Sequence, residues 1–476
     1  MRVKIDNFHG IRPRLHPSLL EQGMATRAHN CRLKNGKLVP LREPARAANS
    51  RTYKCGDLDS LADATSIHAW KVRTSAGPEV RFLAFKGVTW MSEGNIADDE
   101  YDRVFITGDT GVDFTSVGGE TASDTPAVFL FSRSANSYIA RTLVKEAPQS
   151  ITASLADGQS LAQGQTVFYT AFFAAWFDES GYESPLSPSS EIIQINAGST
   201  VSFEVAGVPA EATGVRVYMT RSGTDEASDG IQFIFDKQLD NTHGATVDFT
   251  FAVDPEDAGE QAPGIESIPT DLRCIQHVSG DFYTGFSASN PKTVMFSDIG
   301  IVTSWPVAYR YDVKDNIVAL ATTANSVYAL TDGWPWVLSG TSPESMTATK
   351  LAGPAACVSP RGVCVYRNAV YFVSNEGLMS IQNSADAGTV CVNVTQTVFT
   401  KDQWLALNPS SCVMMQHDGA LFMFFRAQDG TPMEGLVIDL AEGADAVTTH
   451  EESARCACVD VSEDKMYFVR DLGEEE

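Results

Sequence analysis

Nucleophilic, metal-dependent and phosphate-binding chemistry each require residue patterns that this sequence lacks. There is no Gly-x-Ser-x-Gly turn to present a nucleophile, and the eight histidines are dispersed without a metal-ligand spacing such as His-Glu-x-x-His. Neither Gly-x-x-x-x-Gly-Lys-Ser/Thr nor a strand-linked Gly-x-Gly-x-x-Gly occurs. We therefore expect a protein that is not an enzyme, with no catalytic, cofactor-binding or metal-binding residues and no cofactor.

Two acidic clusters and the cysteines are the remaining candidates for binding chemistry. Residues 98–100 and 474–476 lack EF-hand order and are interpreted as solvated charge. The nine cysteines include no Cys-x-x-Cys pair, which indicates free, mostly buried thiols in a reducing compartment. With no signal peptide and no apolar run of about 18 residues, the sequence predicts a protein made in a cytoplasm, without membrane insertion.

The charge of the chain is strongly negative and unevenly placed. Sixty acidic residues against 35 basic ones give a formal net charge of −25, which opposes general affinity for nucleic acid because phosphates would be repelled. Residues 1–51 carry 11 basic and three acidic residues, about +8, which leaves about −33 for the rest. Such a basic segment is expected to dock on an acidic surface, and the alternative is a solvated arm.

The first 48 residues are expected to form an extended arm and not a domain. Pro13, Pro17 and Pro40 interrupt any long helix, although residues 18–27 could form a short one. The run CRLKNGKLVPL predicts a hairpin about Asn35-Gly36, since Asn-Gly is the strongest short turn signal.

A repeat in the C-terminal part predicts the architecture. Aromatic residues within its apolar strands are spaced by 45, 43, 51 and 45 residues, and they are Tyr283, Tyr328, Tyr371, Phe422 and Tyr467. A period near 45 with about four strands per unit is the signature of a β-propeller. Residues 66–110 resemble the same unit, so we expect blades on both sides of the central region, with N- and C-terminal strands pairing to close the ring.

Residues 150–262 differ in character from the repeat. They contain five or six strands about 10–15 residues apart, the spacing of a β-sandwich. Pro185 and Pro188 mark an edge connection, because proline cannot donate to a central ladder. The predicted domains are therefore the arm (1–48), the first propeller blades (49–149), the sandwich insert (150–262) and the remaining blades (263–476).

Tryptophans of the repeat region raise the question of glycan binding. They are interpreted as blade core in preference to a sugar-stacking surface, and they are Trp305, Trp334, Trp336 and Trp404. Carboxylates contributed by different blades could still form a glycan-hydrolysing pair, so that alternative stays open.

Three features resemble virion proteins of tailed bacteriophages. The arm carries a Gly-x-x-Pro-Arg start, an Ala-x-x-Ala-x-Asn-Cys segment and a Gly-x-Leu-x-Pro hairpin, at Gly10, Pro13, Arg14, Ala25, Ala28, Asn30, Cys31, Gly36, Leu38 and Pro40. The run YTAFFAAWFDESGYESPLSPSS followed by GVRVYMTRSG resembles the immunoglobulin- or fibronectin-type insert of such proteins. With the propeller repeat, the chain resembles the tail nozzle or hub protein of short-tailed phages, although it ends soon after Tyr467 without an obvious last strand.

The resemblance implies an all-β structural protein of the virion, in which a β-propeller holds an inserted immunoglobulin/fibronectin-like β-sandwich and an extended N-terminal arm. It implies a homo-oligomeric ring, assembled in the host cytoplasm, that extends the tail channel and connects to an adaptor, fibre or needle protein. DNA would be only passing cargo, repelled by an acidic wall. The alternative is a receptor-binding or adhesion module of the tail that recognises a surface glycan.

Basic residues of the arm are the expected assembly contacts with an acidic surface of an adjacent subunit or ring, namely Arg12, Arg14, Arg27, Arg32 and Lys34. The alternative is that the arm packs back on its own propeller.

Overall fold

The computed structural model describes residues 8–34, 37–47, 51–112, 114–115, 121–122, 124–220, 230–240, 242–324, 326–384, 388–443 and 446–470. Their regular secondary structure is almost entirely β, so the predicted all-β class is confirmed. Their one α-helix is α1 (Lys401–Leu405), and their 3-10 turns are η1 (Pro17–Leu19), η3 (Leu61–Asp63), η4 (Pro255–Asp257), η5 (Val307–Tyr309), η6 (Pro343–Ser345) and η7 (Pro409–Ser411).

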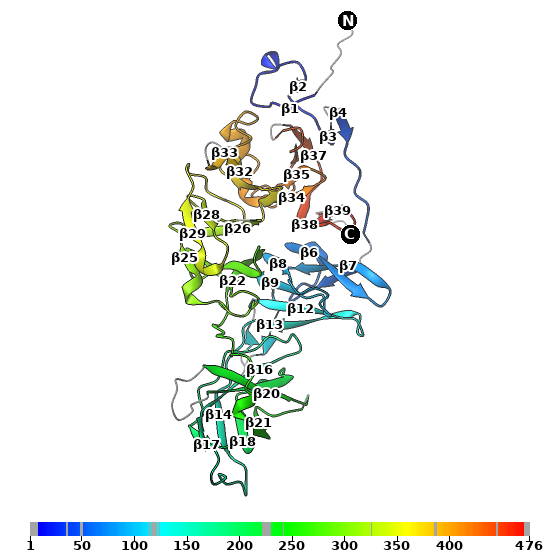
Figure 1. Ribbon diagram of the computed structural model, residues 1–476. Coiled ribbons are helices and arrows are strands. Elements are labelled where there is room, and N and C mark those ends of the chain that lie inside the picture. The colour runs from blue at the N-terminus through cyan, green and yellow to red at the C-terminus, as the bar shows by residue number, and fades with distance from the viewer. Residues whose placement is uncertain are drawn as a thin grey trace.

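The described residues form seven propeller blades (Figure 1). Blades 1 and 2 precede the insert and comprise β5 (Thr52–Lys54), β6 (Ser66–Thr74) and β7 (Gly77–Phe85), then β8 (Thr89–Glu93), β9 (Val104–Gly108), β12 (Ala127–Ser132) and β13 (Ser137–Thr142). Between β9 and β12 lies a small ribbon of β10 (Phe114–Thr115) and β11 (Thr121–Ala122).

Blades 3 to 7 follow the insert. Blades 3 and 4 are β22 (Leu272–Val278), β23 (Phe282–Ser287), β24 (Thr293–Phe296) and β25 (Arg310–Asp312), then β26 (Ile317–Thr323), β27 (Ser326–Thr331), β28 (Trp336–Ser339) and β29 (Thr347–Lys350). Blades 5 to 7 are β30 (Val363–Tyr366), β31 (Ala369–Ser374), β32 (Gly377–Ser384) and β33 (Gly388–Asn393), then β34 (Val413–His417), β35 (Ala420–Phe424), β36 (Gly435–Asp439) and β37 (Val447–His450), then β38 (Ala454–Asp460) and β39 (Lys465–Arg470). The five aromatic residues that set the repeat lie in the second strand of these five blades.

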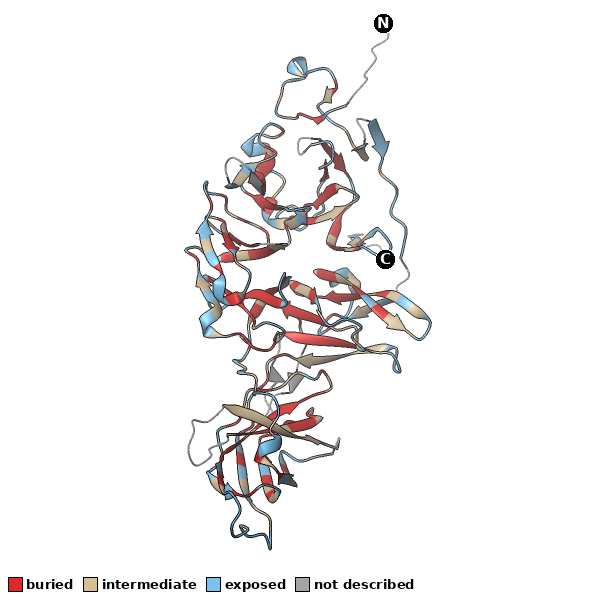
Figure 2. Ribbon diagram, viewed as in Figure 1, coloured by how far each residue is buried: buried red, intermediate tan, exposed pale blue. Residues whose placement is uncertain are grey.

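The ring closes by packing of blade faces. A buried apolar cluster lies between each consecutive pair of blades, and Phe82 of blade 1 packs with Cys456 and Cys458 of blade 7. The expected pairing of terminal strands is wrong, because β5 pairs with β7 and β38 with β39 in separate sheets. Figure 2 shows the buried inner strands that these faces create. Apolar side chains on both faces of each blade are sufficient to close the ring without a shared ladder.

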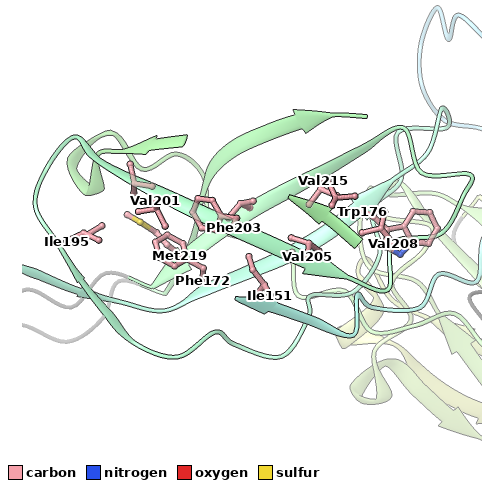
Figure 3. Packing of buried hydrophobic residues seen from close by; sticks show 14 of the residues in the cluster. Ile151, Phe172, Trp176, Ile195, Val201, Phe203, Val205, Val208, Val215 and Met219 are labelled. Carbon is pink, nitrogen blue, oxygen red and sulfur yellow. The ribbon is translucent and has the colours of Figure 1, made fainter. Parts of the chain in front are cut away.

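The insert is an immunoglobulin/fibronectin-like sandwich between β13 and β22. One sheet has the order β14 (Ser150–Leu155), β18 (Ser199–Ala206) and β21 (Thr246–Val253), and the other β16 (Phe172–Phe177), β19 (Gly214–Thr220) and β20 (Ile231–Gln238), beside a ribbon of β15 (Phe168–Thr170) and β17 (Ile193–Ile195). Phe172, Phe203 and Trp176 fill the space between the sheets (Figure 3). Buried residues alternate with less buried ones along β18, which fits one face toward this core.

The free edge of β16 is covered by three serines spaced three residues apart. Alternate backbone N–H groups of β16, from Phe172 to Trp176, donate to the hydroxyls of Ser190, Ser187 and Ser184 at 2.9, 3.0 and 3.1 Å. The backbone N–H groups of the same serines donate to the carbonyls of β16 at 2.8–2.9 Å. The segment with Pro185 and Pro188 thus lies at a sheet edge, where proline is tolerated.

Removing one hydroxyl from this serine ladder should destabilise the sandwich. Ser187→Ala leaves the buried N–H of Ala174 without its side-chain partner, so we expect a loss of about 1–2 kcal/mol in the free energy of unfolding. Urea denaturation measures this loss. Ser189→Ala, at an exposed position in the same segment, is the matched control and should have no such effect; equal losses for the two variants would contradict the ladder.

A buried histidine in blade 6 should make stability depend on pH. His450 is 1% exposed, and burial lowers its pKa to about 4, while its Nε2 lies 3.2 Å from the carbonyl oxygen of Met423. The unfolded chain, with a histidine pKa of about 6.5, binds the proton more readily. Stability is therefore retained above pH 6.5 and lost as the pH falls toward 4, by about 3 kcal/mol in total.

Chemical denaturation at neutral pH and near pH 4.5 checks this expectation. His450→Gln should lose less stability on acidification than the wild type, because glutamine does not titrate. The exposed His16→Gln serves as control and should behave as the wild type does. Identical acid losses in all three proteins would show that His450 is not responsible.

Candidate assembly site

The arm is held against blades 5 and 6 of its own chain. Its first strand, β1 (Gly10–Ile11), pairs in parallel with β2 (Met24–Ala25). Ile11 is 3% exposed and belongs to the apolar cluster between blades 5 and 6. Residues 18–27, where a short helix was possible, contain only the end of η1 and the strand β2. An apolar anchor therefore fixes one end of the arm.

A second arm segment extends the outer edge of blade 6. The backbone N–H of Thr449 in β37 donates to Ala28 O, and the N–H of Asn30 donates to Thr449 O, both at 2.8 Å. Asn30 has a φ of 52°, a left-handed conformation that asparagine tolerates, and its side chain accepts the N–H of Glu451 at 3.1 Å. The Thr448 hydroxyl donates to Cys31 O at 2.6 Å. The motif residues Ala28, Asn30 and Cys31 thus dock the arm.

The predicted hairpin follows this segment. Strand β3 (Cys31–Lys34) pairs antiparallel with β4 (Lys37–Pro40), and the turn residues Asn35 and Gly36 lie outside the described residues. Strand β4 is exposed throughout, whereas β3 lies against β36 and β37.

Basic residues of the hairpin meet aspartates of blade 6. The Arg32 guanidinium lies 2.8 Å from Asp418 and 3.0 Å from Asp439, and Lys34 Nζ lies 3.1 Å from Asp418. The side chain of Asp439 is only 3% exposed. Hydrogen bonding to Lys34, with the charge of Arg32, lowers the pKa of Asp418. Basic arm and acidic blade are therefore complementary in charge.

The other three predicted contact residues also interact within the chain. Arg27 lies 2.9 Å from Glu434, while Arg14 donates its Nη1 to Gln396 O at 2.5 Å. Arg12 is 4% exposed, and its Nη1 donates to Ile11 O at 2.9 Å. The structure thus has the arm packed on its own propeller, the second of the two alternatives. Contacts of these five residues with an adjacent subunit stay a prediction.

Arg32→Ala should weaken the docking of the arm. It leaves the buried Asp439 carboxylate without its guanidinium partner, so we expect a loss of about 2–3 kcal/mol in the free energy of unfolding. Arg27→Ala, which removes an ion pair with a 70% exposed arginine, is the control and should cost less than about 1 kcal/mol. Guanidinium denaturation measures both, and a neutral Arg32→Ala would contradict the proposed anchor.

Neighbouring blades are joined by hydrogen bonds to side chains. The N–H of Ile275 in blade 3 donates to the Thr107 hydroxyl of blade 2 at 3.1 Å. The N–H of Leu320 in blade 4 donates to Cys274 Sγ of blade 3 at 3.2 Å. Burial raises the pKa of Cys274 to about 12, as befits a thiol that stays protonated in a core.

Arg361 is hydrogen-bonded to residues of three other blades. It precedes β30 of blade 5, and its Nη1 donates to Thr65 O beside blade 1 at 2.9 Å and to Arg455 O of blade 7 at 2.8 Å. Its own carbonyl accepts the N–H of Met414 in blade 6 at 3.0 Å. The side chain and the backbone carbonyl of Arg361 together link blade 5 to blades 1, 6 and 7.

A buried ion pair supports the base of the sandwich. Lys145 Nζ lies 2.5 Å from the Asp178 carboxylate, and both side chains are 1% exposed. The ammonium also lies 4.4 Å from the ring centroid of Trp176. Desolvation lowers the pKa of Lys145. Because Lys145 follows β13 of blade 2 and Asp178 follows β16 of the sandwich, this pair joins the two domains.

Residues after Asp178 dock on blade 2. Arg103 donates its Nη1 to Ser180 O at 2.8 Å and lies 5.4 Å from the ring centroid of Tyr182, which packs on Phe105. The Asp99 carboxylate lies 2.6 Å from Arg103 Nε, and its side chain is only 9% exposed. The interpretation of residues 98–100 as solvated charge is therefore wrong for Asp99, because this residue is buried in an ion pair with Arg103. Residues 474–476 lie outside the described residues.

Sequence reasoning missed Arg361, Lys145 and Asp178. Each is a single charged residue whose partners are distant in the chain, so no local pattern marks it. The serine ladder did leave a signal in the spacing of Ser184, Ser187 and Ser190.

Other groups that could do chemistry are placed as follows. Six of the nine free cysteines are buried. Among the described residues, no three His, Cys, Asp or Glu side chains come together in a way that could hold a metal ion, and no helix has the length and apolar character of a membrane span. Trp305 and Trp404 are 0% and 1% exposed and belong to blade cores, whereas Trp334 and Trp336 are partly exposed.

Comparison with known proteins supplies no function. No family profile and no curated protein matches the sequence. The chain is similar in structure to Hsv2 of Kluyveromyces lactis (10% identity, 55% of this chain and 68% of that chain, TM-score 0.28). It is also similar to apo AztD of Citrobacter koseri, with 10% identity over 64% of this chain and 77% of that chain and a TM-score of 0.29. A third similar structure is YCF48 bound to D1 peptide, with 9% identity over 87% of this chain and 94% of that chain and a TM-score of 0.30. Likenesses this weak transfer no function to this chain.

Proposed function

We propose that this chain is a ring-forming structural subunit of a bacteriophage tail, of the nozzle or hub class. It extends the tail channel for DNA passage and connects to neighbouring tail proteins such as an adaptor, fibre or needle. It is made in the host cytoplasm and resides in the virion. The observation that carries the proposal is that the arm residues with the phage-protein pattern, Ala28, Asn30 and Cys31 among them, are the ones that bind the arm to blade 6.

The arrangement of the domains supports an assembly role. Arm and sandwich lie at opposite ends of the propeller (Figure 1), so the chain presents one surface to each of two different neighbours. The Lys145–Asp178 pair and the docking of Tyr182 hold the sandwich firmly at its end. A subunit that holds two tail proteins in a fixed arrangement needs such a rigid connection between its domains.

DNA passage requires a channel formed between copies of the chain. Within one propeller, the Arg361 guanidinium binds the carbonyls of Thr65 and Arg455 and so ties blades 5, 1 and 7 together. The proposal therefore places the duplex outside the propeller, in an opening that a ring of copies encloses. The formal net charge of −25 favours a wall that repels phosphates, so that the duplex slides.

Electron microscopy of the purified protein and of phage tails containing it tests this function. We expect closed rings with a central opening, and antibody label against the chain at the tail. Isolated protein should bind duplex DNA no more strongly than serum albumin of similar charge at physiological salt. A chain that stays monomeric in tails, or that releases product from capsular polysaccharide, would overturn the proposal, and specific binding on a glycan array would favour the receptor-binding alternative.

A further inference from the structure

A linker that is exposed over residues 42–47 joins the arm to the propeller (Figure 2). Leu41 before it packs against the apolar cluster between blades 6 and 7. The linker passes blade 7 and enters blade 1 at Arg51, whose guanidinium lies 3.0 Å from Glu79. Apart from Leu41, the arm contacts described above lie on blades 5 and 6.

The dock on blades 5 and 6 offers the arm three kinds of interaction. It has an apolar site for Ile11, an open edge of β37 for residues 28–31, and aspartates that receive Arg32 and Lys34. All its contacts with the arm join residues far apart in the sequence. Nothing in their chemistry requires the arm and the dock to belong to one chain.

We propose that in the assembled ring the dock on blades 5 and 6 receives the arm of a second copy of this chain. The proposal rests on the proposed function, because exchange of arms links neighbouring copies into the ring. Arm exchange replaces each contact within a chain by the same contact between chains, so it loses little free energy. The ten residues 41–50 reach at most about 33–36 Å when extended, which limits the exchange to an adjacent copy.

Charge complementarity is the reason to name a second copy as the partner. The basic arm fits the acidic dock of blade 6 through Arg27 with Glu434 and Arg32 with Asp418 and Asp439. Every copy carries both an arm and a dock, which gives a heterologous contact that closes into a ring when the rotation permits.

Disulfide trapping between two different variants tests the exchange. His29 and Thr449 are bridge partners whose side chains approach to 3.1 Å, a position suited to a disulfide. One chain carries His29→Cys and the other Thr449→Cys, each with Cys31→Ser to remove the neighbouring thiol. Neither chain alone holds both halves of the engineered pair. We expect a covalent dimer as the major new band on a non-reducing gel after mixing, assembly and oxidation.

The double variant in one chain shows whether the pair can form at all. As a dilute monomer it should close within the chain, and in rings it should give a ladder of covalent multimers. Rings in which the mixed single variants give no dimer, while the double variant closes as a monomer, would overturn the exchange and leave the proposed function standing. Absence of rings from the wild type would overturn the function and the exchange with it.

Charge swapping provides a second readout that needs no thiol. Arg32→Asp reverses a charge on the arm of one chain, and Asp418→Arg, at a 45% exposed position, reverses the matching charge on the dock of the other. If arms exchange, a mixture alternating the two chains restores every arm–dock pair, so mixing should restore assembly that each variant alone has lost. If arms stay within their chains, every pair remains mismatched, and failure of the mixture to assemble would overturn the exchange.

Discussion

Lys145→Met is expected to lower the free energy of unfolding by about 3–5 kcal/mol, since it leaves the Asp178 carboxylate buried without its cation. Removing one partner of a fully buried pair costs far more than the net attraction within the pair. Urea denaturation measures the loss. Because the pair joins blade 2 to the sandwich, the amide hydrogens of residues 178–184 should also exchange with solvent faster in this variant than in the wild type.

Two companion variants separate the buried charge from other effects. Lys145→Met combined with Asp178→Asn should recover at least half of the lost stability, because no unpaired charge remains. Arg141→Ala breaks the nearby ion pair between Arg141 and Glu179, whose side chains are 32% and 23% exposed respectively. This variant should lower the free energy of unfolding by no more than about 1 kcal/mol. A single Lys145→Met variant as stable as Arg141→Ala would contradict the expected role of the pair.

Arg361→Ala is expected to destabilise the propeller by about 3 kcal/mol. The substitution removes two hydrogen bonds from a charged donor, to Thr65 O and Arg455 O, each worth about 1.5 kcal/mol or more. Since these bonds connect blade 5 to blades 7 and 1, hydrogen exchange in β6 and β38 should accelerate most.

Arg367→Ala provides the matched control in the same blade. Arg367 is exposed and lies 5.1 Å from the Tyr366 ring centroid, so its loss should change stability by less than about 1 kcal/mol. Arg361→Lys should retain part of the stability, because a lysine donates without the planar fork of arginine. Equal stability of all three variants would show that Arg361 does not join the blades.

The propeller was predictable because its signal is repeated and local. Each blade places an aromatic residue in its second strand, and Tyr283, Tyr328 and Tyr371 recur at similar intervals because each blade needs the same apolar strand. The sandwich was visible for a related reason, since alternation along its strands reports one buried face. The closure of the ring was not predictable, because face packing of Phe82 on Cys456 depends on residues more than 370 positions apart.

The candidate assembly site was half predictable. Composition marked the arm as basic, and its motif marked Asn30, but the sequence could not decide between a dock on its own blades and one on a neighbour. The structure supplied the dock as a single surface built from blades 5 and 6.

By itself the sequence determined the all-β class, the repeat and the unlike central segment, because these follow from periodic burial and turn residues within a few positions. Tertiary structure alone decided the number of blades, the Lys145–Asp178 joint and the hydrogen bonds of Arg361 to other blades. Each of these depends on which distant surfaces meet when the ring closes. A buried charge acquires its partner only then, and no local pattern of residues records that partner.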